Sequence, residues 1–140
     1  MKIYNGEGIV LGRLASAVAK DSLLGEEVVV INCDKIIVSG KKENTFANEK
    51  QRRVRKGYPL KSAKFSRLPD RYVRRSIRGM VPWKQTRGKE AYKRIMCHVG
   101  VPQEFADKET IKLEKATVKK LPTLKYTTVG EVCRNLGGNV

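Results

Sequence analysis

The chain has 140 residues, and its 30 Lys and Arg residues against 14 Asp and Glu residues give a formal net charge of +16. Hydrophobic residues make up 40% of the sequence, which supplies one folded core and excludes wholesale disorder. No apolar run approaches about 18 residues, which excludes a membrane-spanning helix, and residues 1–6 form no hydrophobic segment of signal-peptide length. We therefore expect a cytoplasmic protein whose excess charge is neutralised by a polyanion, and nucleic acid is the commonest polyanion in a cell.

The first 40 residues predict an α/β core. Residues 2–5 predict a short strand, and residues 11–22 carry apolar side chains at helical spacing before a stop at Gly25. Two runs rich in β-branched residues, 27–31 and 36–39, are typical of strands that are buried on both faces. This order of elements indicates a largely parallel sheet.

After Gly40 the sequence becomes polar and increasingly basic. Residues 41–56 predict a polar helix with a thin apolar stripe. The stripe consists of Phe46, Ala47 and Val54. Residues 57–59 break this helix, and a basic loop runs from there to Pro69.

The clearest helical pattern lies in residues 70–78. At 100° per residue, its apolar positions fall within an arc of about 140° and its arginines within an opposite arc of about 100°. The apolar arc contains Tyr72, Val73, Ser76, Ile77 and Met80, and the opposite arc contains Arg71, Arg74, Arg75 and Arg78. One face can therefore be buried while the other presents four guanidinium groups. Gly79 can end this helix, and Pro82 prevents its continuation.

The last third of the chain predicts two more helices and a strand. Residues 87–94 predict a short basic helix with inward Ala91 and Tyr92, followed by a final strand at 95–99. Thr128 and Glu131 fit a capping box, which opens a C-terminal helical tail at about 127–137. No linker divides the chain, so residues 1–140 are predicted to form a single domain.

The glycines near the N-terminus do not form a dinucleotide-binding motif. Gly6 and Gly8 fit the start of G-x-G-x-x-G, but the third glycine, Gly12, comes one residue late. The spacing favours a turn before a helix. Arg13, directly after this turn, can contact a phosphate or lie on the surface as an ordinary charge.

The sequence predicts neither an enzyme nor a metal or cofactor site. The three cysteines are too far apart for a Cys-x-x-Cys site, and their odd number does not fit a disulfide framework. His98 follows Cys97, but neighbours on a strand point to opposite faces, which is unsuitable for activating a nucleophile. We expect no cofactor and no small-molecule substrate.

Nearly all the excess charge lies in residues 50–94, which hold 17 basic and two acidic residues, a net of +15. A solvated face usually mixes both signs, so this segment favours a polyanion-binding surface, and arginine forks bind phosphate bidentately. Trp83 and Tyr58 could stack on unpaired bases, whereas Tyr72 is better explained as core. The candidate RNA-binding residues are Arg13, Lys50, Arg52, Arg53, Arg55, Lys56, Lys61, Lys64, Arg67, Arg71, Arg74, Arg75, Arg78, Trp83, Lys84, Arg87, Lys89, Lys93 and Arg94.

Several blocks of the chain resemble the large-subunit ribosomal protein 13 family, in particular its archaeal and eukaryotic branch, of which the archaeal members fit better. The matching blocks are residues 77–82 (Ile-Arg-Gly-Met-Val-Pro), Gly88-Lys89, 95–100, 11–16 and 32–40. The resemblance implies a three-layer α/β/α fold around a four-stranded, mainly parallel sheet, with the basic helix and loop as an insertion. It also implies a non-enzymatic constituent of the large ribosomal subunit that contacts large-subunit rRNA and neighbouring ribosomal proteins and assembles early. His98 departs from the family pattern, in which tyrosine is usual at this position.

Two alternatives stay open from the sequence. A free-standing RNA-binding regulator of translation would use the same basic surface with a transient partner, and it would leave large subunits in a moderate salt wash. A nucleotide-dependent enzyme using the early glycines would instead bind a mononucleotide stoichiometrically.

Overall fold

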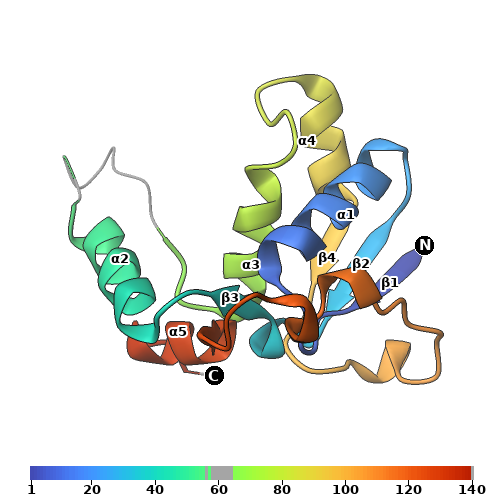
Figure 1. Cartoon of the computed structure of the whole chain (residues 1–140). Coiled ribbons are helices and arrows are strands. Elements are labelled where there is room, and N and C mark those ends of the chain that lie inside the picture. The colour runs from blue at the N-terminus through green and yellow to red at the C-terminus, as the bar shows by residue number, and fades with distance from the viewer. Residues whose placement is uncertain (56, 58–64, 140) are drawn as a thin grey trace.

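A computed structural model describes residues 1–55, 57 and 65–139 (Figure 1). The strands are β1 (Lys2–Asn5), β2 (Val28–Ile31), β3 (Ile37–Ser39), β4 (Ile95–Cys97) and β5 (Tyr126–Thr128). The α-helices are α1 (Leu11–Leu23), α2 (Lys42–Val54), α3 (Pro69–Arg78), α4 (Thr86–Lys93) and α5 (Val129–Asn135). Four 3₁₀ turns are also described: η1 (Cys33–Lys35), η2 (Gln103–Phe105), η3 (Glu114–Ala116) and η4 (Val118–Lys120). The mixed α/β class predicted from the sequence is confirmed.

The main sheet has three parallel strands in the order β1-β2-β4. The central strand, β2, pairs with β1 through Val30 opposite Tyr4 and with β4 through Val30 opposite Cys97. All four residues of β2 are buried, as its continuous β-branched run predicts for a strand covered on both faces.

The prediction of a four-stranded sheet is wrong, because β3 does not join the three strands of the main sheet. Asn32 adopts a left-handed conformation, with φ 55°, and starts η1, which turns the chain away from the parallel direction. Strand β3 then pairs antiparallel with β5, with Ile37 opposite Thr128, and forms a separate two-stranded sheet. The C-terminal tail therefore begins with a strand, and its helix α5 starts at Val129. The N-cap half of the predicted capping box is confirmed, since Thr128 Oγ1 accepts a hydrogen bond from the Glu131 backbone N–H at 3.2 Å, while the Glu131 carboxylate pairs with Lys42.

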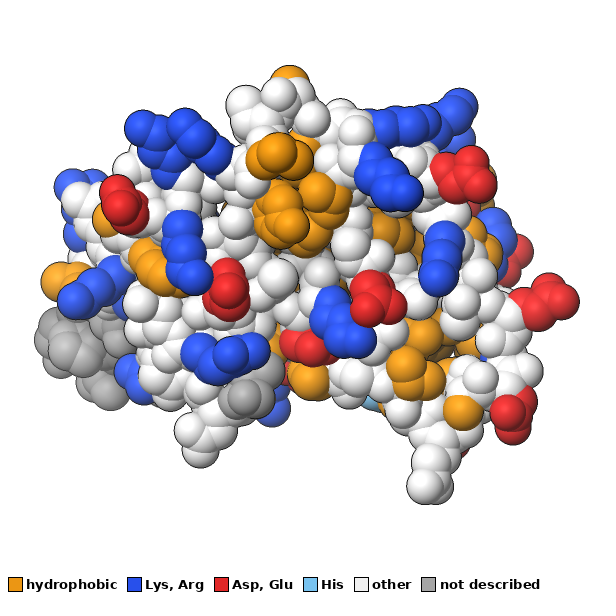
Figure 2. All heavy atoms as spheres, turned by 60° about the horizontal axis from the view of Figure 1, so that its bottom comes forward, with side chains coloured by type: hydrophobic (Ala, Val, Ile, Leu, Met, Phe, Trp, Pro, Cys, Tyr) orange, Lys and Arg blue, Asp and Glu red, His pale blue; other side chains and the backbone are white. Residues whose placement is uncertain are grey.

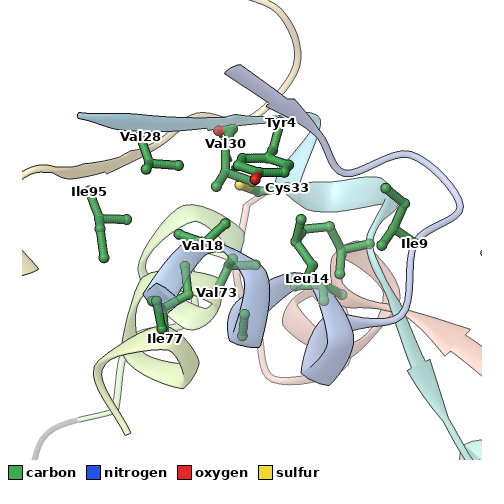
Figure 3. Packing of buried hydrophobic residues seen from close by; sticks show 14 of the residues in the cluster. Tyr4, Ile9, Leu14, Val18, Val28, Val30, Cys33, Val73, Ile77 and Ile95 are labelled. Atoms are coloured by element: carbon green, nitrogen blue, oxygen red, sulfur yellow. Dashed lines mark hydrogen bonds between the residues drawn. The ribbon is translucent and has the colours of Figure 1, made fainter. Parts of the chain in front are cut away.

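The main core lies between the sheet and two helices, α1 and α3 (Figure 3). Leu14 and Val18 of α1 and Val73 and Ile77 of α3 are fully buried. Each fully buried side chain of this kind contributes about 1.5–3 kcal/mol relative to exposure. This packing fixes the rotation of α3 about its axis, so its arginines lie on the other side of the helix.

The second face of the sheet carries a smaller cluster. Ile3, Val29 and Ile31 are buried there against the half-buried Phe105 of η2. In the described part of the chain, this cluster is covered by the short η2 segment, where the family resemblance implied a layer of α-helix. Gly100 is left-handed, with φ 67°, and Pro102, the N-cap of η2, is extended, so helical conformation begins only at Gln103.

Helix α2 packs differently from its sequence pattern. The predicted apolar stripe is wrong, because Val54 is 74% exposed, Ala47 is exposed and only Phe46 is half-buried. The buried residue of α2 is instead Glu49, which is 6% exposed. In Figure 1, α2 and α5 lie together on one side of the molecule, at a distance from α1 and α4. Among the described residues, no helix is long and apolar enough to cross a membrane.

Candidate nucleic-acid interface

The arginine face of α3 borders a groove between α2 and α3. The groove has a volume of about 590 Å³. Its lining includes six arginines: Arg52 and Arg53 from α2, and Arg71, Arg74, Arg75 and Arg78 from α3. Glu49 is the one carboxylate among the described residues that line it, so the lining carries a net charge of +5 from six arginines and one glutamate. All four arginines predicted from the periodicity of residues 70–78 thus meet at one site.

Three of these arginines lie over aromatic rings. The pairs, measured from the guanidinium carbon to the ring centroid, are Arg74 on Tyr92 at 4.6 Å, Arg75 on Phe65 at 4.0 Å and Arg78 on Trp83 at 5.2 Å. All three distances lie within the range of about 6 Å for cation–π attraction. Trp83 and Tyr92 also contact each other edge to face at 4.8 Å. These contacts leave the three arginines half-buried, whereas Arg71 is exposed.

Glu49 joins α2 to α3 at the base of the groove. Its Oε1 accepts hydrogen bonds from Arg52 Nη1 at 3.0 Å and from the Tyr72 hydroxyl at 3.2 Å. Its Oε2 lies 3.7 Å from Arg53 Nη1. Burial and the charge of Glu49 raise the pKa of the Tyr72 hydroxyl well above its ordinary value, so this hydroxyl retains the proton that it donates. The side chain of Tyr72 is thus a structural link, in agreement with its interpretation as core.

Arg53 is largely used by the protein itself. Its side chain is only 11% exposed, and its Nη2 donates to the Ser66 backbone oxygen at 2.6 Å. This bond connects α2 to the segment that precedes α3. Among the candidate residues, Arg53 therefore has less freedom to reach a ligand than Arg52, whose side chain is 66% exposed.

Like charges crowd the α3 side of the groove. Burial lowers the pKa of the Arg75 guanidinium below its ordinary value, and the neighbouring charge of Arg78 lowers it further. Both causes disfavour the charged form, and an anion in the groove would offset both. The site is therefore electrostatically suited to a phosphate-bearing ligand.

The remaining candidates lie outside this groove. Lys50, Arg55, Arg67, Lys84, Arg87, Lys89 and Lys93 are exposed around it or on α4. Arg94 Nη1 donates to the Ser22 backbone oxygen at 3.3 Å, and Arg13 Nη1 donates to the Lys115 backbone oxygen at 3.1 Å. Lys56, Lys61 and Lys64, together with Tyr58, lie outside the described residues.

The charge on the face shown in Figure 2 is distributed differently from the charge in the groove. There, acidic and basic side chains are interspersed, which is the ordinary pattern of a solvated surface. The groove has the opposite character, because its described lining residues include six arginines and one carboxylate. The contrast distinguishes the groove from general surface charge.

The residues that suggested enzyme chemistry have structural roles. Cys97 packs against the main core, while the His98 ring lies 5.8 Å from the Phe105 ring, next to the smaller cluster. The two side chains are thus separated by the sheet, as their adjacent strand positions predict. Gly6 packs tightly against Ile36, and Gly8 adopts φ 69°, so the early glycines form a turn before α1. No group of three or more potential metal ligands occurs among the residues that the structure describes.

The groove residues that were not identified as site residues from the sequence include Glu49, Phe65 and Tyr92. Glu49 stands three and four positions before Arg52 and Arg53, which is the helical spacing for ion pairs. Phe65 is an isolated aromatic residue in a basic loop. The spacing could have revealed the ion pairs of Glu49, whereas the contact between Phe65 and Arg75 depends on the path of the loop.

The fold and the groove together define a mixed α/β domain with a concentrated arginine surface. The family model for Ribosomal protein L13 matches residues 1–104, which include the groove. The chain belongs to this family, in its archaeal branch.

Similar curated proteins cover nearly the whole chain. Large ribosomal subunit protein uL13 of Methanococcoides burtonii is 41% identical over 138 residues, which cover 98% of both chains. The protein of the same name from Methanococcus maripaludis is 45% identical over 140 residues, again covering 98% of both chains. The one from Methanopyrus kandleri is 43% identical over 137 residues, covering 96% of this chain and 86% of the relative. The resemblance inferred from the sequence blocks is thereby confirmed.

Proposed function

We propose that this chain is a structural constituent of the large ribosomal subunit and binds large-subunit rRNA through the groove and the surrounding basic residues. The observation that carries the rRNA-binding part is the gathering of six arginines around one carboxylate. The names of its relatives, each a large ribosomal subunit protein, support the ribosomal part. The protein would act in cytoplasmic ribosomes, beside neighbouring ribosomal proteins, and join the subunit early in assembly.

The proposed mechanism is electrostatic and geometric. Arginine forks donate parallel hydrogen bonds to phosphate oxygens, and each neutralised phosphate releases condensed counterions. The apolar core holds α3 at a fixed rotation, so its arginines face the RNA and its valine and isoleucine side chains face the sheet. No covalent step is required, and the role of the chain is to shape and hold folded RNA.

The other candidates would extend the contact beyond the groove. Lys84 lies exposed on the turn before α4, and Arg87 and Lys89 lie exposed in the first half of α4, where they can meet further phosphates. Arg13 and Arg94 each donate to a backbone oxygen of the protein, so we assign them weaker contributions. The basic helix and loop would then work as an insertion on an α/β scaffold that forms one domain.

Salt dependence tests this proposal. For about eight neutralised phosphates, the binding constant for in vitro transcribed large-subunit rRNA should fall with log[salt] at a slope of roughly −6 to −7. Replacing Arg71 and Arg78 with Ala should reduce the magnitude of this slope by about 0.7–0.9 for each phosphate that is no longer neutralised. Lys108→Ala with Lys112→Ala removes the same charge at exposed positions outside the basic segment and should leave the slope unchanged.

A slope near zero for the unmodified protein would refute RNA binding through phosphates. Sedimentation tests the ribosomal part separately. The protein should remain with large subunits, at one copy each, after a moderate salt wash. Release in that wash would favour a free-standing translational regulator.

A further inference from the structure

Three aromatic rings from separate parts of the chain meet the arginine face of α3. Phe65 precedes the helix, Trp83 lies in the turn that follows it, and Tyr92 belongs to α4. We call these three residues the supporting rings. Each lies against a different groove arginine, at centroid distances between 4.0 and 5.2 Å. Sequence periodicity cannot produce this matching, because the three rings come from different segments.

The contacts restrict side chains that are otherwise very mobile. A free arginine side chain carries about 2 kcal/mol of rotamer entropy, part of which is lost when it binds a ligand. A ring that covers one face of the guanidinium limits its orientations before any ligand arrives. The N–H groups lie in the guanidinium plane, so a ring against one face does not itself block them, although Arg74 Nη2 already donates to the Tyr92 backbone oxygen at 3.5 Å.

The repulsion between neighbouring arginines on α3 argues for an anionic ligand. Arg75 and Arg78 are three positions apart on α3, and their charges repel each other. Glu49, the one carboxylate among the described lining residues, lies against Arg52 and Arg53 on the α2 side. The rings therefore hold cationic groups together on the α3 side, where a bound phosphate would relieve the repulsion.

We propose that the supporting rings are positioning residues for RNA: they hold the arginines of α3 in the orientation that clamps the phosphates of one RNA strand in the groove. This inference rests on the proposed rRNA binding and specifies how the site achieves it. The volume of about 590 Å³ between α2 and α3 is suited to a short stretch of sugar–phosphate backbone rather than to a whole duplex. On this view the rings contribute through the arginines and not by stacking on bases.

The test uses Phe65, whose ring lies nearest to its arginine. Cation–π attraction of about 0.5–1 kcal/mol at an exposed site corresponds to a two- to fivefold change in affinity. Phe65→Leu should therefore weaken binding to the large-subunit rRNA transcript by about this factor, with an unchanged salt slope because the phosphate contacts remain. Phe65→Tyr keeps a ring and should restore the affinity.

A double-mutant cycle separates positioning from direct contact with RNA. Arg75→Ala should reduce both affinity and salt slope, and adding Phe65→Leu in that background should have no further effect. The matched control is Phe105→Leu, because Phe105 lies 5.1 Å from Lys108 in a cation–π pair outside the basic segment. This control should bind RNA like the unmodified protein.

The possible outcomes distinguish the positioning role of the rings from the proposed rRNA binding. If the unmodified protein binds rRNA and Arg75→Ala weakens binding but Phe65→Leu does not, positioning is overturned while the proposed function stands. If Phe65→Leu weakens binding equally in the Arg75→Ala background, the ring contacts RNA directly and positioning is again overturned. If the unmodified protein does not bind rRNA, the proposed function itself fails. Should Phe65→Leu fail to fold, Trp83→Leu with Arg78→Ala provides the same cycle at the second pair.

Discussion

Replacement of Glu49 by Gln should detach α2 from α3, because this buried carboxylate links the two helices. It accepts a hydrogen bond from Tyr72, forms an ion pair with Arg52, and lies 3.7 Å from a nitrogen of Arg53. Gln has nearly the same shape and retains one acceptor oxygen, so the substitution removes the negative charge with little change in volume.

The expected loss is about 2–4 kcal/mol in the free energy of unfolding. Hydrogen bonds to charged groups contribute about 1.5–3 kcal/mol, and a neutral acceptor retains roughly half of this for Tyr72. Arg53, with its side chain 11% exposed, loses its buried counter-charge, which costs about 1–2 kcal/mol. Arg52 adds only a few tenths of a kcal/mol, because its side chain is 66% exposed and the ion pair is screened by water.

Urea denaturation measures the global effect, and hydrogen exchange of the amides in residues 42–54 shows whether α2 opens locally. Glu43→Gln provides the control, since it makes the same charge change at an exposed position of the same helix. The reasoning is refuted if both variants unfold at the same free energy and exchange their α2 amides at the same rate. Local opening alone, with unchanged global stability, would show that α2 is a separate cooperative unit.

Two further predictions concern the scaffold. A hydrogen bond from the Tyr4 hydroxyl at 2.6 Å, with support from Lys2, lowers the pKa of the Asp21 carboxyl. The ionised Asp21 carboxylate therefore stabilises the folded protein above the ordinary carboxyl pKa of about 3.9. This contribution to stability is lost as the pH falls through the lower pKa of the folded state. In urea titrations from pH 7 to pH 3, Asp21→Asn should be less stable at pH 7 and lose less stability on acidification; parallel curves would contradict this. Gly88→Ala should lower the free energy of unfolding by about 1–2 kcal/mol, because its new methyl group would collide with the Pro82 carbonyl, whereas Gly12→Ala in open space should raise it by up to about 1 kcal/mol in the same assay.

The elements that could be predicted from the sequence are those whose pattern is local. The periodicity of residues 70–78 predicted the burial of Val73 and Ile77 and the arginine face of α3, because a helix repeats its environment every turn, whereas Met80, beyond the end of the helix, is 43% exposed. The β-branched run of β2 predicted a strand buried on both faces for a similar reason. In each case the local pattern of apolar residues determines how the element is buried.

The features that could not be predicted depend on contacts between distant segments. Strand β3 has the composition of a sheet strand, but its partner β5 lies about 90 residues later and contains only three residues. Most of the apolar stripe expected for α2 is exposed, and the one buried side chain of the helix is the polar Glu49, which bonds to Tyr72 of α3. Composition identifies which residues can be buried, but it does not show which of them find a partner.

Both kinds of element meet in the groove. Helix α3 rests on the main core, so its arginines are placed by hydrophobic burial. Helix α2 buries a single side chain, Glu49, whose one negative charge leaves the lining at a net +5. More carboxylates would hold α2 more firmly but would cancel the field that attracts phosphates. The positive charge of the groove therefore limits how many carboxylates can stabilise it. A bound polyanion would raise the free energy of unfolding by mass action, because it binds the folded protein in preference to the unfolded chain.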